Sequence, residues 1–135
     1  MRRWAAGFLS VMLIGWSAGG FCAEPTAEQL RDTIRKYIQQ QEAALGAFTI
    51  PDPKGNGKLR SLTLVRVHDR VGKTGDYYYS CTDMKDITTE DQLDLDFDIA
   101  DTGKDLKVVA VRIHKDNGKP RYTYDDNDNL IPLAP

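Results

Sequence analysis

The sequence predicts an α+β domain in which one N-terminal amphipathic helix packs on a curved antiparallel meander of four to five strands. Apolar residues recur at helical spacing up to Gly46, and from Phe48 onward they recur at every second position. Turns rich in Gly, Asp and Asn divide this second part into short extended segments. Because a lone amphipathic helix cannot bury its apolar face, the helix must lie on the sheet.

The helix is predicted to begin after Thr26 and to end before Gly46. Thr26 and Gln29 have the spacing of a capping box, in which each side chain accepts a hydrogen bond from the backbone N–H of the other residue. Gly46 is the expected C-cap, because glycine adopts the left-handed conformation at little cost. The apolar face of the helix is formed by Leu30, Ile34, Ile38 and Leu45.

Strands are expected where β-branched, aromatic and aliphatic residues gather. The run from Leu59 to Val71 changes its apolar parity between Leu64 and Val65, which predicts a bulge. Residues 116–118 predict a tight hairpin turn. The expected extended segments are residues 47–50, 59–71, 77–82, 93–99, 106–114 and 121–124, with a short edge pairing at 130–131.

The order of helix and meander resembles that of cystatin-like domains, with NTF2-like and PepSY-like domains as alternatives. The resemblance concerns the architecture only. The Q-x-V-x-G inhibitory loop of true cystatins is absent, since the nearest segment, residues 68–72, lacks the glutamine. The resemblance therefore implies no protease-inhibitor activity.

Residues 1–23 have the pattern of a cleavable signal peptide. Two arginines give a positive start, residues 4–16 are uncharged and largely apolar, and small residues follow. The apolar run is short beside the ~20 residues of a membrane-spanning helix. We expect cleavage after Ala23, with Gly20 as the alternative. The mature chain would be a single α+β domain at residues 24–135, periplasmic or secreted.

The cut site decides the chemistry of the cysteines, because Cys22 is next to it and Cys81 is the only other one. Cleavage after Ala23 leaves Cys81 alone, whereas cleavage after Gly20 permits a Cys22–Cys81 disulfide in an oxidising compartment. Cys81 is interpreted as a half-buried strand residue, because no neighbouring base in the sequence would activate it as a nucleophile.

The charge balance excludes some classes of function. The chain has 18 basic and 20 acidic residues, spread along its length, for a net charge of −2. A nucleic-acid-binding domain would show a basic patch or stripe, and a membrane-anchored protein would show a polybasic segment. The sequence shows neither feature, so it argues against both classes. No specific catalytic or nucleotide-binding motif is found, so no cofactor is predicted and the chain is expected not to be an enzyme.

Three aspartates, Asp94, Asp96 and Asp98, alternate with apolar residues and share one face of a predicted strand. They are candidate ligands for Ca²⁺, which takes six to eight oxygens, so a Ca²⁺-dependent binding module is one alternative function. A rigid strand spaces these side chains too widely for one ion unless loops contribute ligands. The simpler interpretation is a solvated acidic face. Its cross-strand partners would be Lys107, Arg112 or His114.

A small enzyme or a metal site is the second alternative. His68 and His114 are the only histidines, and each lies on a predicted strand. If these strands are neighbours, both imidazoles could join Cys81 in a site of the kind that binds Zn²⁺ or Cu²⁺. Nothing in the spacing of the three residues requires such a site.

Tyrosines are the preferred candidates for partner binding. Period two places Tyr77 and Tyr79 on one face of their strand, and Tyr122 and Tyr124 share a face of theirs. An exposed tyrosine patch suits recognition, because tyrosine offers a large contact area at low entropic loss. Cross-strand packing within the sheet is the alternative for the same residues. The predicted function is therefore an exported module that binds a protein or peptide partner.

Overall fold

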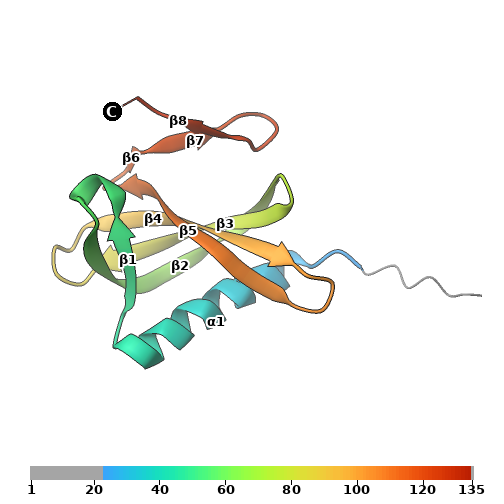
Figure 1. Cartoon of the computed structure of the whole chain (residues 1–135), viewed down its shortest axis with the longest axis horizontal. Coiled ribbons are helices and arrows are strands. Elements are labelled where there is room, and N and C mark those ends of the chain that lie inside the picture. Colours follow the sequence, from blue (N-terminus) through green and yellow to red (C-terminus); the bar gives the residue numbers. More distant parts are fainter. Residues whose placement is uncertain (1–22, 135) are drawn as a thin grey trace, which may run out of the picture.

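The computed structural model describes residues 23–134, which form an α-helix, a six-stranded antiparallel sheet and a two-stranded ribbon (Figure 1). Most of the predicted signal peptide, with Cys22, lies outside the described residues. No helix within them is long and apolar enough to cross a membrane. The elements are α1 (Ala27–Leu45), β1 (Phe48–Asp52), a 3-10 turn (Pro53–Gly55), β2 (Lys58–Thr74), β3 (Tyr77–Asp86), β4 (Gln92–Asp101), β5 (Leu106–Asp116), β6 (Lys119–Pro120), β7 (Tyr122–Tyr124) and β8 (Leu130–Pro132).

Helix α1 begins and ends where the sequence predicts. Thr26 and Gln29 exchange hydrogen bonds between side chain and backbone, which confirms the capping box. Gly46 ends the helix with a φ of 83°, in the left-handed region that favours glycine. Leu45, in the last turn, is exposed. The residues of the helix that are buried against the sheet are Leu30, Ile34 and Ile38.

The strands of the sheet follow one another in chain order, and each neighbouring pair is antiparallel. The meander is confirmed, but the sheet has six strands instead of the predicted four to five. After the turn at residues 117–118, only Lys119 and Pro120 pair with β5. One more backbone hydrogen bond, from the N–H of Arg121 to the carbonyl of His114 at 2.8 Å, follows this pairing before the chain leaves the sheet. From Arg121 it continues into the β7–β8 hairpin, where the sequence predicts one more strand of the meander.

Strand β2 has two irregularities in its pairing with β3. The first lies at Val65 and confirms the bulge that the change in apolar parity predicts. At the second irregularity, residues 68–70, including His68, are not paired with β3. The Ser80 hydroxyl of β3 donates to the carbonyl of Arg70 at 2.9 Å, which satisfies a backbone group in this unpaired segment.

The two faces of the sheet have different partners. One face packs on α1 and forms the apolar core, in which Phe97 and Ile99 of β4 are fully buried. The other face carries the aspartates of β4 and lies beneath the β7–β8 hairpin, on the side opposite α1 (Figure 1). Every residue of β4 from Leu93 to Ile99 is consequently buried. This arrangement places Asp96, the middle one of the three aspartates, between the sheet and the hairpin.

Gly72 of β2 is expected to tolerate no side chain. A Cβ at this position would lie 2.4 Å from the ring of Tyr79, which is buried, stacks on Tyr124 and donates a hydrogen bond to Asp128. Gly72→Ala is therefore expected to lower the free energy of unfolding by about 1–3 kcal/mol, as measured by urea denaturation. Thr63→Ala, at an exposed position of the same strand, is the control and should change it by less than about 0.5 kcal/mol. Equal losses in the two variants would contradict the close contact.

Candidate functional site

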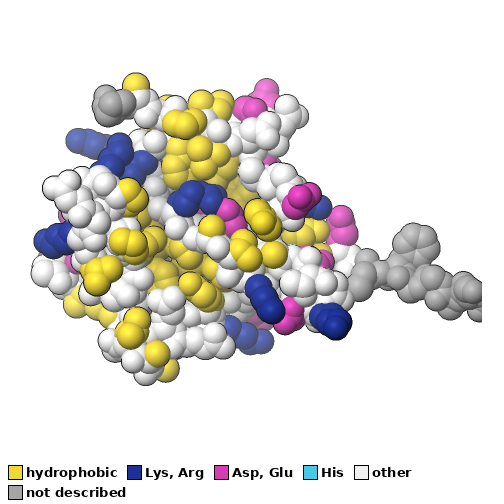
Figure 2. Space-filling model, in the orientation of Figure 1, with side chains coloured by type: hydrophobic (Ala, Val, Ile, Leu, Met, Phe, Trp, Pro, Cys, Tyr) yellow, Lys and Arg dark blue, Asp and Glu magenta, His cyan; other side chains and the backbone are white. Residues whose placement is uncertain are grey.

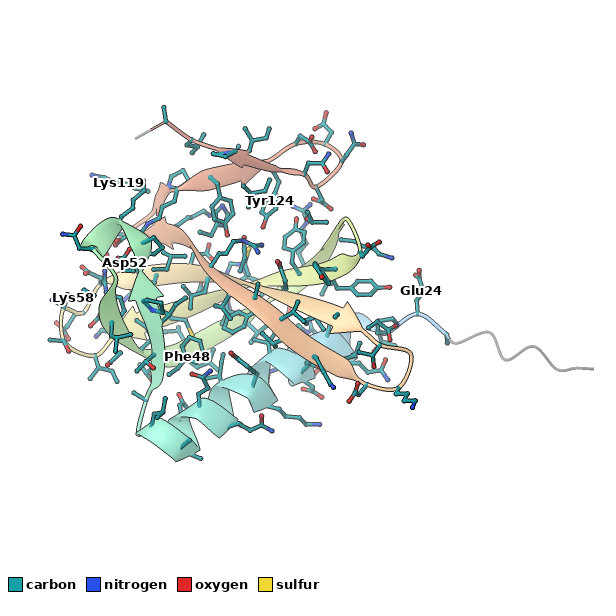
Figure 3. The ribbon with its side chains drawn as sticks, in the orientation of Figure 1. Glu24, Phe48, Asp52, Lys58, Lys119 and Tyr124 are labelled. Carbon is teal, nitrogen blue, oxygen red and sulfur yellow. The ribbon has the colours of Figure 1, made fainter. Side chains whose placement is uncertain are left out.

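The β7–β8 hairpin is held on the sheet through Asp96, at the centre of β4. Asp96 is fully buried, and its Oδ2 accepts hydrogen bonds from the hydroxyls of Tyr122 and Tyr124, each at 2.6 Å. Its Oδ1 accepts one from the thiol of Cys81, on β3, at 2.7 Å. Figure 3 shows Tyr124 between the hairpin and the sheet. Three donors from two elements thus converge on one carboxyl group.

His114 of β5 completes this cluster. A register shift in the pairing of β5 with β4 leaves His114 without a paired residue on β4. Its Nδ1 lies 3.9 Å from Cys81 Sγ and 3.8 Å from Asp96 Oδ2, and its ring stacks on Tyr122 at 4.7 Å between centroids. The structure therefore brings together two of the three residues proposed for a Cys/His site.

Cys81 lies in surroundings that keep its thiol protonated. Burial raises the pKa of this thiol far above its ordinary range, and the adjacent Asp96 raises it further. A cysteine nucleophile needs the opposite, an electropositive environment that lowers its pKa. The surroundings of Cys81 are therefore not those of a cysteine nucleophile.

His68, the other predicted ligand, belongs to a second cluster. Its Nε2 lies 2.7 Å from Asp83 Oδ1, and these two residues form a group of possible metal ligands with Asp94. Asp94 is shared with the group that contains Cys81 and His114. The structure therefore divides the predicted set, and the two histidines do not share a ligand group.

The expectation of a solvated acidic face is wrong, because all three aspartates are buried. Asp94, Asp96 and Asp98 are 8%, 0% and 8% exposed. Asp98 receives two hydrogen bonds from the guanidinium of Arg112, which confirms one of the expected cross-strand pairs. Asp94 has Lys115 Nζ at 3.4 Å. Of the three candidate Ca²⁺ ligands, Asp94 and Asp96 share a ligand group, whereas Asp98 lies outside both groups.

The four tyrosines chosen for partner binding are placed differently from one another. Tyr79 and Tyr122 are buried, Tyr124 is half-buried, and Tyr77 is exposed. Tyr79 stacks on Tyr124 and donates to Asp128 in the hairpin at 2.9 Å. Three of the four therefore fix the hairpin to the sheet and form no open patch. A partner-binding role for these tyrosines stays a prediction.

An apolar groove of about 570 Å³ lies between β1 and β5. Residues 48–51 of β1 and 108–113 of β5 line it consecutively. Since side chains alternate between the faces of a strand, a consecutive lining means that each strand presents its edge to the groove. Within the described residues, β1 pairs with β2 alone, and β5 pairs with β6 only at residues 115–116. Figure 2 shows apolar atoms gathered between these two strands.

Sequence reasoning missed this groove and the cover over β4. A strand pattern predicts which side chains share a face, but it does not predict which edges stay unpaired. Pro120 is the signal that could have indicated the end of the meander, because proline is rare inside a paired strand and this one lies just before two tyrosines. Comparison with protein-family models, with curated proteins and with solved structures found no match.

Proposed function

We propose that this chain is a non-enzymatic binding module that takes an extended peptide segment of a protein partner into the groove between β1 and β5. The unpaired edge of β5 at residues 108–113 is the observation that carries the proposal. An open edge presents backbone N–H and C=O groups with which an added strand can pair. Pro51 lies on the β1 edge and removes one donor there, so β5 is the expected docking edge.

The lining of the groove indicates what kind of peptide fits. Val109 is 49% exposed, and apolar side chains from both strands surround it. Arg112 and Arg121 also line the groove, but each is already paired with an aspartate. Backbone hydrogen bonds and apolar contacts, more than charge, should therefore set the preference. The expected ligand is an extended segment with apolar residues at alternate positions.

We place this activity in the periplasm or outside the cell, because residues 1–23 have the pattern of a signal peptide. The cystatin-like layout remains the proposed architectural comparison for the helix and meander. It contributes nothing to the proposed activity, since the segment that would correspond to the inhibitory loop lacks its glutamine.

Selection of displayed random peptides on the purified protein tests the proposal. Enriched peptides should show alternating apolar residues, and their binding should slow hydrogen exchange of the amides of residues 108–113. Val109→Asp should weaken their binding by about 10-fold, because it places a charge where an apolar contact is expected. Fluorescence anisotropy of labelled peptides measures this change.

Val65→Asp is the matched control. Val65 is also an exposed valine at a bulge, but it lies on β2, outside the groove. It should change peptide affinity by less than about 2-fold. Selection that enriches no peptide, or peptides that respond equally to the two substitutions, would contradict the proposal.

A further inference from the structure

We propose that Cys81, Asp94, Asp96 and His114 form a binding site for a divalent transition-metal ion, with Zn²⁺ as the ion that fits best. One ligand atom from each residue lies within 4.8 Å of the others. The residues come from three adjacent strands, β3, β4 and β5, so the sheet itself fixes their relative positions. The site lies beneath the hairpin, apart from the proposed peptide groove.

The separations suit a tetrahedral ion. The ligand atoms of a tetrahedral Zn²⁺ site lie about 3.5 Å from one another. Cys81 Sγ and His114 Nδ1 are 3.9 Å apart, and His114 Nδ1 is 3.8 Å from Asp96 Oδ2. Small side-chain rotations would bring these atoms into contact with one ion. The hydroxyls of Tyr122 and Tyr124 hold the Asp96 carboxyl group in place, as outer hydrogen bonds commonly do for metal ligands.

Asp94 gives an independent indication. Asp94 is 8% exposed, and its Oδ1 is buried without a hydrogen-bond partner in the part of the chain that the structure describes. A buried carboxylate oxygen without a partner is costly unless a cation or donor compensates it. The other oxygen of Asp94 faces Lys115 at 3.4 Å, whereas no lysine or arginine of the described chain forms an ion pair with Asp96. Of these two buried carboxyl groups, only that of Asp94 pairs with a lysine. A divalent cation would supply the missing positive charge.

The ligand types select the class of ion. Sulfur and imidazole ligands favour Zn²⁺ and related transition metals, whereas Ca²⁺ requires six to eight oxygens. Binding would form a bond from the metal to Cys81 Sγ and release the thiol proton to solvent. The two carboxylates and the resulting thiolate are negative, and Lys115 is positive. A divalent ion would neutralise the negative charge that remains.

Metal titration of the full 135-residue chain, made without export so that residues 1–23 are kept and purified under reducing conditions, tests the site. After treatment with a chelator, calorimetry should show binding of Zn²⁺, and Co²⁺ should give a thiolate-to-metal charge-transfer band. His114→Gln and Cys81→Ser should each weaken Zn²⁺ binding by more than about 100-fold, because each removes a direct ligand. Absence of the Co²⁺ band from the unaltered protein would overturn the proposal whether or not the variants fold.

The chain supplies a matched control for each substitution. His68→Gln alters the only other histidine, and Cys22→Ser alters the only other cysteine. Both variants should keep the Zn²⁺ affinity and the Co²⁺ band. If His68→Gln lost Zn²⁺ binding and His114→Gln kept it, the ion would be assigned to the cluster of His68, Asp83 and Asp94. That result would overturn this assignment. A thermal stabilisation by millimolar Ca²⁺ without one by Zn²⁺ would overturn the choice of ion.

Discussion

Asp96→Ala is expected to lower the free energy of unfolding by about 3–5 kcal/mol. The substitution removes the acceptor for the hydroxyls of Tyr122 and Tyr124 and for the thiol of Cys81. These donors would be left in a region where Asp96 itself is fully buried, so water could replace the lost acceptor only if the hairpin moved. The expected result is a less stable domain whose hairpin no longer packs tightly on the sheet.

Urea denaturation followed by far-ultraviolet circular dichroism measures the loss, and the near-ultraviolet tyrosine signal reports the packing of the hairpin. Asp126→Ala is the control, because Asp126 is an exposed aspartate of the same hairpin and its side chain forms no hydrogen bond or ion pair with residues 23–134. It should change the free energy of unfolding by less than about 0.5 kcal/mol. A loss below about 1 kcal/mol in Asp96→Ala would show that the hairpin is held mainly elsewhere.

The parts of the fold that depend on local pattern could be predicted from the sequence. The capping box at Thr26, the C-cap at Gly46 and the bulge at Val65 all follow from neighbouring residues, and the structure contains each of them. Period two also placed the aspartates of β4 together on one face, opposite the apolar residues. These features need no knowledge of which elements meet in space.

The burial of that face could not be predicted, because it depends on contacts distant in sequence. Asp96 and Tyr124 are joined by a hydrogen bond across 28 positions, and Asp52 and Arg121 by one across 69 positions. An alternating pattern of aspartates is typical of a solvated strand and does not reveal a covering hairpin. The same limit applies to Cys81 and His114, whose contact depends on β3 and β5 both flanking β4.

Asp52 links the start of the hairpin to the edge of the sheet. Its carboxyl group accepts hydrogen bonds from Arg121 at 2.6 Å and 3.1 Å, and Arg60 lies 3.3 Å away. Asp52 is 4% exposed, and Figure 3 shows it at the end of β1 nearest the hairpin. The hydrogen bonds from Arg121, opposed by burial, lower its pKa from 3.8 to about 2. Asp52 is therefore a source of acid sensitivity.

Asp52→Asn is expected to lower the free energy of unfolding at neutral pH by about 2–3 kcal/mol, because it removes the negative charge that pairs with Arg121 and Arg60, which keep Asp116 and Asp86 as partners. Since the folded pKa of Asp52 lies below the unfolded one, its ionisation stabilises the fold in full above about pH 4. This stabilisation by the ionised Asp52, about 2 kcal/mol, is lost as the pH falls toward about 2. The difference in stability between the unaltered protein and Asp52→Asn should consequently narrow over this interval. Urea denaturation at a series of pH values measures this difference, with Asp126→Asn, at an exposed aspartate of the hairpin, as the control. A difference that stays constant down to about pH 2 would show that Asp52 titrates alike in the folded and unfolded chains.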